Sequence, residues 1–140
     1  MVMLRYLLDA NVLSEPMRPD PNPAVLARIE AHRRISGTAA PVWHELWFGC
    51  ERLPVSRRRQ RLENYLLDVV QPTTEILPYD AAAAHWHSAE RARLVSIGLT
   101  PPFSDSQIAA IAAINGLILV TANVADFRHF NGLLIENWHE

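Results

Sequence analysis

The chain has 140 residues, 49% of them hydrophobic, and a formal charge of −2, which are typical of one globular domain that buries a core without disulfides. All 13 basic residues are Arg and Cys50 is the only cysteine, so lysine-dependent chemistry, an intrachain disulfide and a cysteine zinc cluster are excluded. Because the sequence shows neither a membrane span nor a signal peptide, we expect a single cytoplasmic domain over residues 1–140.

Short apolar runs alternate with helical segments along the chain, a pattern that predicts an open parallel sheet covered by helices on both faces. The expected strands are residues 6–8, 35–39, 74–77, 117–121 and 133–135. Residues 10–15 are expected to form a helical turn that stops at Pro16, and longer helices are expected after the N-caps Asn22, Ser56, Asp80 and Ser104 and at Pro41. The run 117–121 is apolar almost throughout and is expected at the centre of the sheet.

Four carboxylates fall next to the predicted strand ends or in the first turns of helices: Asp9, Glu45, Asp105 and Asp126. Asp9 alone is equally well explained as a helix cap. In a parallel sheet, however, all four would meet in one crevice at the carboxyl edge, where ligands bind. Two unit charges about 4 Å apart repel by roughly 4 kcal/mol at an effective dielectric near 20, so such a cluster requires a cation or protons.

The absence of clustered His and Cys favours a hard ion, Mg²⁺ or Mn²⁺, at these oxygen ligands. Such an ion activates water and neutralises charge on a phosphodiester, so the predicted reaction is phosphodiester hydrolysis. Arg57 to Arg61 are interpreted either as an RNA-facing patch or as a solvated helix face. His85 and His87 are two residues apart, cannot form an i, i+4 metal pair, and are expected at the surface or its boundary.

Four segments of the chain, residues 7–15, 44–46, 105–110 and 120–127, resemble the PIN-domain ribonucleases, and specifically the VapC-type toxins of bacterial toxin–antitoxin pairs. The resemblance spans nearly the whole chain. It implies a PIN-like three-layer α/β sandwich with an open, mostly parallel sheet of four to five strands flanked by helices. It also implies a Mg²⁺- or Mn²⁺-dependent endoribonuclease.

The resemblance implies roles for particular residues of this chain. The catalytic and metal-binding carboxylates would be Asp9, Glu45, Asp105 and Asp126, and the supporting polar residues would be Asn11, Thr121 and Asn123. Two positions depart from the family pattern: Ala10 stands where Thr or Ser is frequent, and His44 where Ala is common. Neither departure removes a metal ligand.

The expected partners of such a toxin are an RNA substrate, a second copy of the chain and a cognate antitoxin that inserts a segment into the active-site groove. The aromatic residues that flank Glu45, namely Trp43, Trp47 and Phe48, are candidates for dimer or antitoxin contacts, and core packing is the alternative.

Two other functions compete with this interpretation. A catalytically silent PIN-type module would bind RNA or a protein without cleaving, but an idle carboxylate cluster would lower stability. A haloacid-dehalogenase-type phosphatase also starts from a strand that ends in Asp. That family needs a second Asp two residues later, where this chain has Asn11.

Overall fold

The computed structural model describes residues 3–140 and contains a five-stranded sheet in which every strand pairing is parallel. The strands are β1 (Tyr6–Leu8), β2 (Ser36–Ala39), β3 (Glu75–Leu77), β4 (Ile118–Val120) and β5 (Leu134–Glu136). Their order across the sheet is β3-β2-β1-β4-β5. The expected α/β sandwich is confirmed. The middle strand is β1, and β4 lies beside it. The apolar sequence of β4 could not settle this, because every interior strand is buried on both faces and is therefore apolar.

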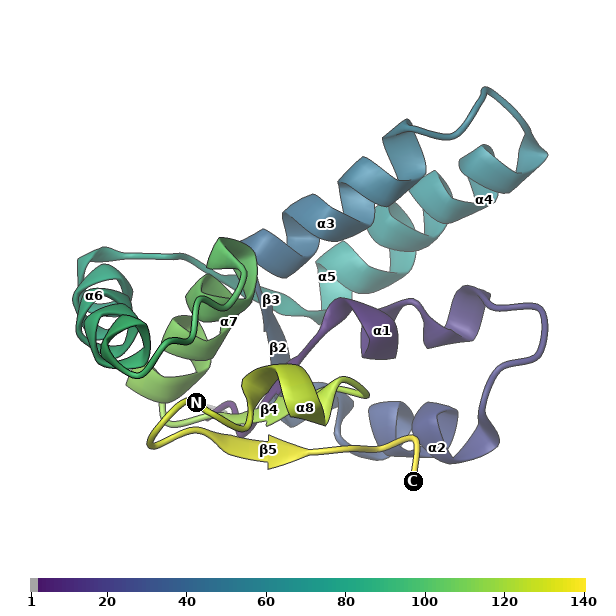
Figure 1. Ribbon diagram of the computed structural model, residues 1–140. Coiled ribbons are helices and arrows are strands. Elements are labelled where there is room, and N and C mark those ends of the chain that lie inside the picture. The colour runs from purple at the N-terminus through teal and green to yellow at the C-terminus, as the bar shows by residue number, and fades with distance from the viewer. Residues whose placement is uncertain (1–2) are drawn as a thin grey trace.

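Helices cover both faces of this sheet. They are α1 (Ala10–Leu13), α2 (Pro23–Ala31), α3 (Ala40–Glu51), α4 (Arg57–Tyr65), α5 (Gln71–Thr73), α6 (Ala81–Ser96), α7 (Phe103–Ile114) and α8 (Val124–Phe127), with 3₁₀ turns η1 (Glu15–Met17) and η2 (Arg33–Ile35) and a π-helical turn η3 (Leu66–Val70). Figure 1 shows α6 and α7 on one side of the sheet and α1, α2 and α5 on the other. Within residues 3–140 no helix has the length and apolarity that a membrane crossing requires.

Most of the predicted helix starts are confirmed by a side-chain oxygen that accepts a backbone N–H. These N-caps are Asn22, Ser56 and Asp80. The prediction for Ser104 is wrong: α7 already begins at Phe103, and its N-cap, Pro102, makes no side-chain cap. Two consecutive prolines hold the preceding backbone extended, so they set the start of the helix without a capping side chain. The helical turn expected over residues 10–15 is present as α1 but already ends at Leu13, and Pro16 lies in the first turn of η1 instead of ending α1.

The crevice of the fold lies beyond the ends of β1 and β4. These neighbouring strands pair with Leu8 opposite Val120, and the sheet runs on from β1 to β2 and from β4 to β5. The connections that leave β1 and β4 therefore diverge, which opens a space at their carboxyl ends. The Asp9 amide donates to the Val120 carbonyl over 3.0 Å, so the first residue after β1 is tied to the last residue of β4.

The helices α3 and α4 form an antiparallel hairpin, residues 40–65, that projects from the body of the domain and is called the arm below (Figure 1). Its base is anchored by the Tyr65 hydroxyl, which donates to the Leu13 carbonyl over 2.6 Å. Within the arm Cys50 is 2% exposed and packs in the core. The sequence predicted both helices but not their projection from the sheet.

His87 is the clearest disagreement with the expected burial. Its side chain on α6 is only 3% exposed, its Nδ1 lies 2.8 Å from the Tyr79 hydroxyl, and its ring packs edge-on against Phe103 at 4.6 Å between centroids. His85, two residues earlier, is exposed as expected. Helix α7 begins close enough to α6 to bring Phe103 over His87, a tertiary contact that helical periodicity alone does not contain.

Burial lowers the pKa of His87, and the Arg91 cation lowers it further. The unfolded chain therefore binds a proton at this residue more tightly than the folded chain does. The contribution of neutral His87 to stability is present above its ordinary pKa of about 6.5 and is lost as the pH falls through its folded-state value. We expect the stability advantage of the wild type over His87→Phe to shrink between pH 7.5 and pH 5, as measured by urea unfolding. An advantage that stays constant with pH would contradict this.

Candidate active site

Asp9 lies at the bottom of the crevice, with only 5% of the residue exposed. Its Oδ1 accepts the Ala10 amide over 2.8 Å, which makes it the N-cap of α1. Its Oδ2 accepts the Thr121 hydroxyl over 2.8 Å and the Asn11 side-chain amide over 3.3 Å. The capping interpretation is therefore correct but incomplete, because capping uses one oxygen while the other is held by two side chains.

Thr121 and Asn11 connect the two loops that border the crevice. The Thr121 hydroxyl, besides donating to Asp9, accepts the Asn123 backbone amide over 3.0 Å. The Asn11 Oδ1 accepts the Ala122 amide over 3.0 Å. These bonds tie the loop after β4 to the loop after β1 and fix the Asp9 carboxylate in one orientation. Of the three residues predicted to support the site, Asn123 contributes through its backbone N–H.

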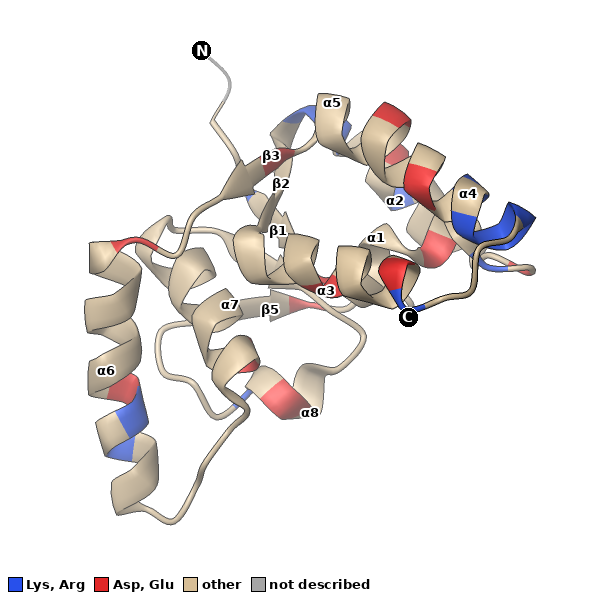
Figure 2. Cartoon of the chain, turned by 90° about the horizontal axis from the view of Figure 1, so that it is seen from above, with Lys and Arg blue, Asp and Glu red and all other residues tan. Residues whose placement is uncertain are grey.

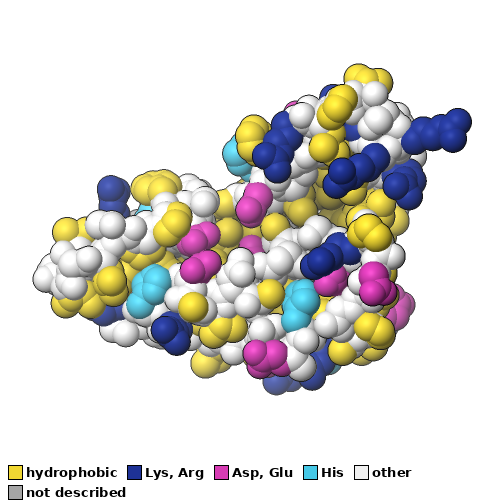
Figure 3. Space-filling view, turned by 45° about the vertical axis from the view of Figure 1, so that its right-hand side comes forward, with side chains coloured by type: hydrophobic (Ala, Val, Ile, Leu, Met, Phe, Trp, Pro, Cys, Tyr) yellow, Lys and Arg dark blue, Asp and Glu magenta, His cyan; other side chains and the backbone are white. Residues whose placement is uncertain are grey.

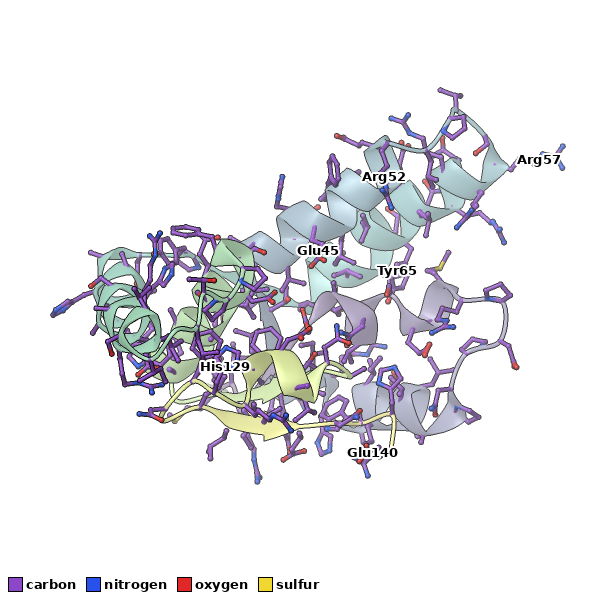
Figure 4. The ribbon with its side chains drawn as sticks, in the orientation of Figure 1. Glu45, Arg52, Arg57, Tyr65, His129 and Glu140 are labelled. Carbon is purple, nitrogen blue, oxygen red and sulfur yellow. The ribbon has the colours of Figure 1, made fainter. Side chains whose placement is uncertain are left out.

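The other three predicted carboxylates come from three different helices. Glu45 is exposed in the second turn of α3, Asp105 is half-buried in the first turn of α7, and Asp126 is exposed on α8. Figure 4 shows Glu45 on the side of α3 that faces the body of the domain. In Figure 2 the helices that carry these residues surround the end of β1, so elements far apart in sequence deliver acidic groups to one region.

The electrostatics indicate how closely these groups approach one another. Burial is the main cause that raises the pKa of Asp105 to about 6, and the charges of Asp9, Asp126 and Glu45 raise it further. Burial and the charge of Asp9 also raise the pKa of Glu45. Burial raises the pKa of Asp9 against the hydrogen bonds that lower it, Thr121 first. The charges of these carboxylates therefore act on one another, and their joint ionisation is unfavourable without a cation or bound protons.

The donor set fits a hard divalent cation. The ion pairs found among residues 3–140 leave out all four of these carboxylates. No group of three or more His, Cys, Asp or Glu side chains in that part of the chain is already placed to hold a metal ion. Mg²⁺ does not require such a group, because it keeps several waters and is usually bound through one or two carboxylates and substrate phosphates. The open, all-oxygen arrangement is compatible with that mode.

An apolar hollow of about 190 Å³ lies between the arm and the segment after α1, and Glu45 is the one candidate carboxylate in its lining. Its lining includes Glu45 at one end and Leu46, Leu62 and Tyr65 along its walls. This hollow was not predicted, because it depends on how the arm is set against η1. The one indication in the sequence was that the apolar residues of α3 and of α4 each lie on one side of their helix, which is typical of a surface that packs against another element.

The aromatic residues around Glu45 divide into two groups. Trp43 and Trp47 are half-buried, pack against the core and contact each other edge-to-face at 5.9 Å between centroids. Phe48 is 59% exposed and stacks on the exposed ring of His44 at 6.3 Å. The two tryptophans therefore follow the core-packing alternative, and Phe48 is the aromatic side chain that remains accessible to a partner.

Comparison with known proteins places this geometry in a family. The model of the PIN domain matches residues 6–133 of the chain. The chain belongs to the PIN-domain family. Among its PIN relatives, a plasmid stability protein StbB from Pseudomonas syringae is 31% identical, with 94% of this chain and 97% of the relative covered. A VapC ribonuclease from Sinorhizobium fredii is 30% identical over 94% and 96% of the two chains. A tRNA(fMet)-specific endonuclease VapC from Shigella flexneri is 29% identical over 97% and 99%.

Solved PIN-domain structures match the whole fold. FitAcB from Neisseria gonorrhoeae aligns with a TM-score of 0.87 at 28% identity, covering 95% of this chain and 97% of the matched chain. DNA-bound VapBC from Salmonella typhimurium aligns with a TM-score of 0.83 at 27% identity, covering 97% and 99%. The structural alignments cover nearly the full length of both chains, so the arm and the sheet edge belong to the shared PIN architecture.

Proposed function

We propose that this PIN domain, residues 1–140, is the endoribonuclease toxin of a toxin–antitoxin pair and hydrolyses RNA phosphodiester bonds with Mg²⁺ or Mn²⁺. The observation that carries the proposal is that carboxylates from separate elements, Asp9, Glu45 and Asp126, act on Asp105, whose pKa burial and these charges raise to about 6. Relatives that are named ribonucleases and endonucleases at 29–30% identity, over nearly the whole chain, support it.

Asp9, Glu45, Asp105 and Asp126 would hold the ion. When bound, it lowers the pKa of a water molecule and neutralises charge on the phosphodiester. Asp9 supplies the fixed part of the site, because donors from three residues hold its carboxylate in place. Glu45 and Asp126 are exposed at the rim, where an RNA strand enters. Asn11 and Thr121 act as positioning residues for Asp9 and keep the loops from separating.

The same proposal includes an antitoxin, a second copy of the chain and a cytoplasmic location. Two solved structures that align over nearly the whole chain are named as the pairs FitAcB and VapBC, which supports a protein partner here. The apolar hollow beside Glu45 offers a place for apolar side chains of an inserted segment. Phe48, exposed on the arm, is a candidate contact for either partner.

Metal-dependent RNA cleavage by the purified protein tests the proposal. We expect cleavage of bulk tRNA with Mg²⁺ or Mn²⁺, its loss in excess EDTA, and its recovery when Mn²⁺ is added back in excess of the chelator. Heat-denatured protein from the same preparation controls for a contaminating nuclease that survives heating. Cleavage that persists in EDTA would contradict the metal mechanism. Tight RNA binding with no cleavage under any of these metals would favour the silent binding module instead.

A further inference from the structure

The first turn of α4, at the free end of the arm, concentrates positive charge. Four of the five residues from 57 to 61 are Arg, a density found nowhere else in the sequence. Figure 2 shows this basic group at the far end of the arm. Figure 4 shows Arg57 extending from the tip, away from the rest of the domain.

One of these arginines has a structural role. The Arg59 Nε donates to Glu63 Oε1 over 2.9 Å, and its Nη1 donates to the Leu53 carbonyl over 3.0 Å, so it braces the connection between α3 and α4. Arg57, Arg58 and Arg61 are exposed and form no ion pair or side-chain hydrogen bond with any residue from 3 to 140. The fold therefore accounts for Arg59 and leaves the other three guanidinium groups free.

Their position is unfavourable for the isolated protein. The first turn of α4 contains no acidic residue, so Arg57 and Arg58 face the positive end of the helix dipole, and Arg61 adds a third cation one turn further on. A polyanion bound at this turn would relieve these repulsions. Guanidinium groups also recognise phosphate through paired N–H donors, which suits a nucleic-acid backbone.

The geometry connects these arginines to the carboxylates. A hollow of about 390 Å³ is lined by Met17, Pro19, Arg58, Arg61 and Leu62. Met17 and Leu62 also line the hollow that contains Glu45, so the two spaces are adjacent and follow the inner side of the arm. In Figure 3 basic side chains gather on the arm above an acidic region on the same face.

The spacing suits a single RNA strand. At 1.5 Å per residue, the part of α3 between Glu45 and its end at Glu51 is roughly 9 Å long. That length matches about three nucleotides of a stacked strand at roughly 3.4 Å each. A strand whose scissile phosphate lies at the carboxylates would therefore place phosphates beside the arm a few nucleotides away.

We propose that Arg57, Arg58 and Arg61 bind the phosphate backbone of the RNA substrate a few nucleotides from the cleaved bond and hold the strand against the acidic crevice. The proposal rests on the proposed nuclease function. Because the carboxylates repel RNA and the whole chain has a formal charge of −2, attraction must come from a local patch of this kind. Contacts to phosphate carry no base information, so the patch contributes affinity and register, not sequence preference.

The test compares two triple variants that remove the same charge. Arg57→Gln/Arg58→Gln/Arg61→Gln removes the patch, while Arg5→Gln/Arg34→Gln/Arg91→Gln removes three exposed arginines elsewhere. Each is measured for binding to a fluorescent 12-nucleotide single-stranded RNA, without divalent metal, over a range of NaCl concentrations. We expect the arm variant to bind RNA about tenfold more weakly at 0.1 M salt. The slope of log K against log[NaCl] should also be shallower by about 2, because each of the three lost phosphate contacts contributes roughly 0.7 to it. The control variant should retain the wild-type slope.

Cleavage kinetics separate this proposal from the proposed function. In the arm variant KM for RNA should rise about tenfold with kcat unchanged. An unchanged salt slope together with an unchanged KM would overturn the patch while leaving the nuclease intact. Loss of RNA binding in a protein that never cleaves would support the patch and refute the nuclease. RNA binding that is unaffected while the complex with the cognate antitoxin is lost would assign the arginines to a protein partner and overturn the proposal.

Discussion

Asp9→Asn is expected to lower kcat for RNA cleavage by about a thousandfold or more, because it removes the most firmly positioned charge from the proposed metal site. The fold should survive. An Asn side chain retains one oxygen that can accept the Thr121 hydroxyl, but its NH₂ group then faces the Ala10 amide and that capping bond is lost. The variant also eliminates the repulsion that Asp9 exerts on Glu45 and Asp105, which offsets this loss. Thermal unfolding should therefore show a midpoint close to that of the wild type in EDTA.

Metal binding gives this variant a second readout. Mn²⁺ should raise the unfolding midpoint of the wild type, because a ligand that binds only the folded state stabilises it, and it should raise the midpoint of Asp9→Asn much less. Asp80→Asn is a matched control, since Asp80 caps α6 away from the crevice and Asn caps helices equally well. Full cleavage activity in Asp9→Asn would refute the assigned role of this carboxylate.

The candidate acidic site was predicted from local sequence signals, which are clearest for two of its carboxylates. Asp9 ends an apolar run, and Asp105 stands in the first turn of a helix, so each could be assigned to an element without tertiary information. The topology rule for parallel sheets then brings such residues to one edge. The supporting bonds of Asn11 and Thr121 also follow, because both residues lie within three positions of a strand end.

Features that depend on packing between distant elements were not predictable in the same way. The hollows along the arm depend on the angle at which α3 and α4 leave the sheet, and His87 is buried because α7 brings Phe103 against it. The middle strand of the sheet was also misassigned. Apolarity distinguishes interior strands from edge strands, but it does not rank the interior strands.

The structure gives a separate argument against each of the two rival functions. The phosphatase alternative needs an acidic group at position 11, but Asn11 donates to Asp9 and accepts from the Ala122 backbone, which is a structural role for a neutral amide. In a silent binding module the ionisation of Asp105, Asp9 and Glu45, which their raised pKa values make unfavourable in the fold, would lower stability without serving catalysis. Clustered ionisable groups of this kind are more often retained where they act on a ligand.

The C-terminal tail shows how far the core extends beyond the last strand. Trp138 follows β5 by two residues, and its side chain is completely buried. The indole contacts Tyr6 edge-on at 5.2 Å and His32 at 5.5 Å between centroids, and its Nε1 donates to Glu136 Oε1 over 3.1 Å. Because Tyr6 begins β1, the tail packs directly against the strand that delivers Asp9.

Trp138→Ala is therefore expected to lower the free energy of unfolding by about 3–5 kcal/mol, since it removes a fully buried aromatic side chain and leaves a cavity beside β1. Urea unfolding followed by circular dichroism measures the change, and Trp138→Phe should recover part of it by refilling the cavity. Leu134→Ala is the control from the neighbouring strand β5, because Leu134 is 65% exposed and should change stability by less than about 0.5 kcal/mol. Equal effects of Trp138→Ala and Leu134→Ala would show that the tail does not belong to the core. A larger loss at Trp138, together with weakened Mn²⁺ stabilisation, would show that the tail supports the geometry of Asp9 as well as the fold.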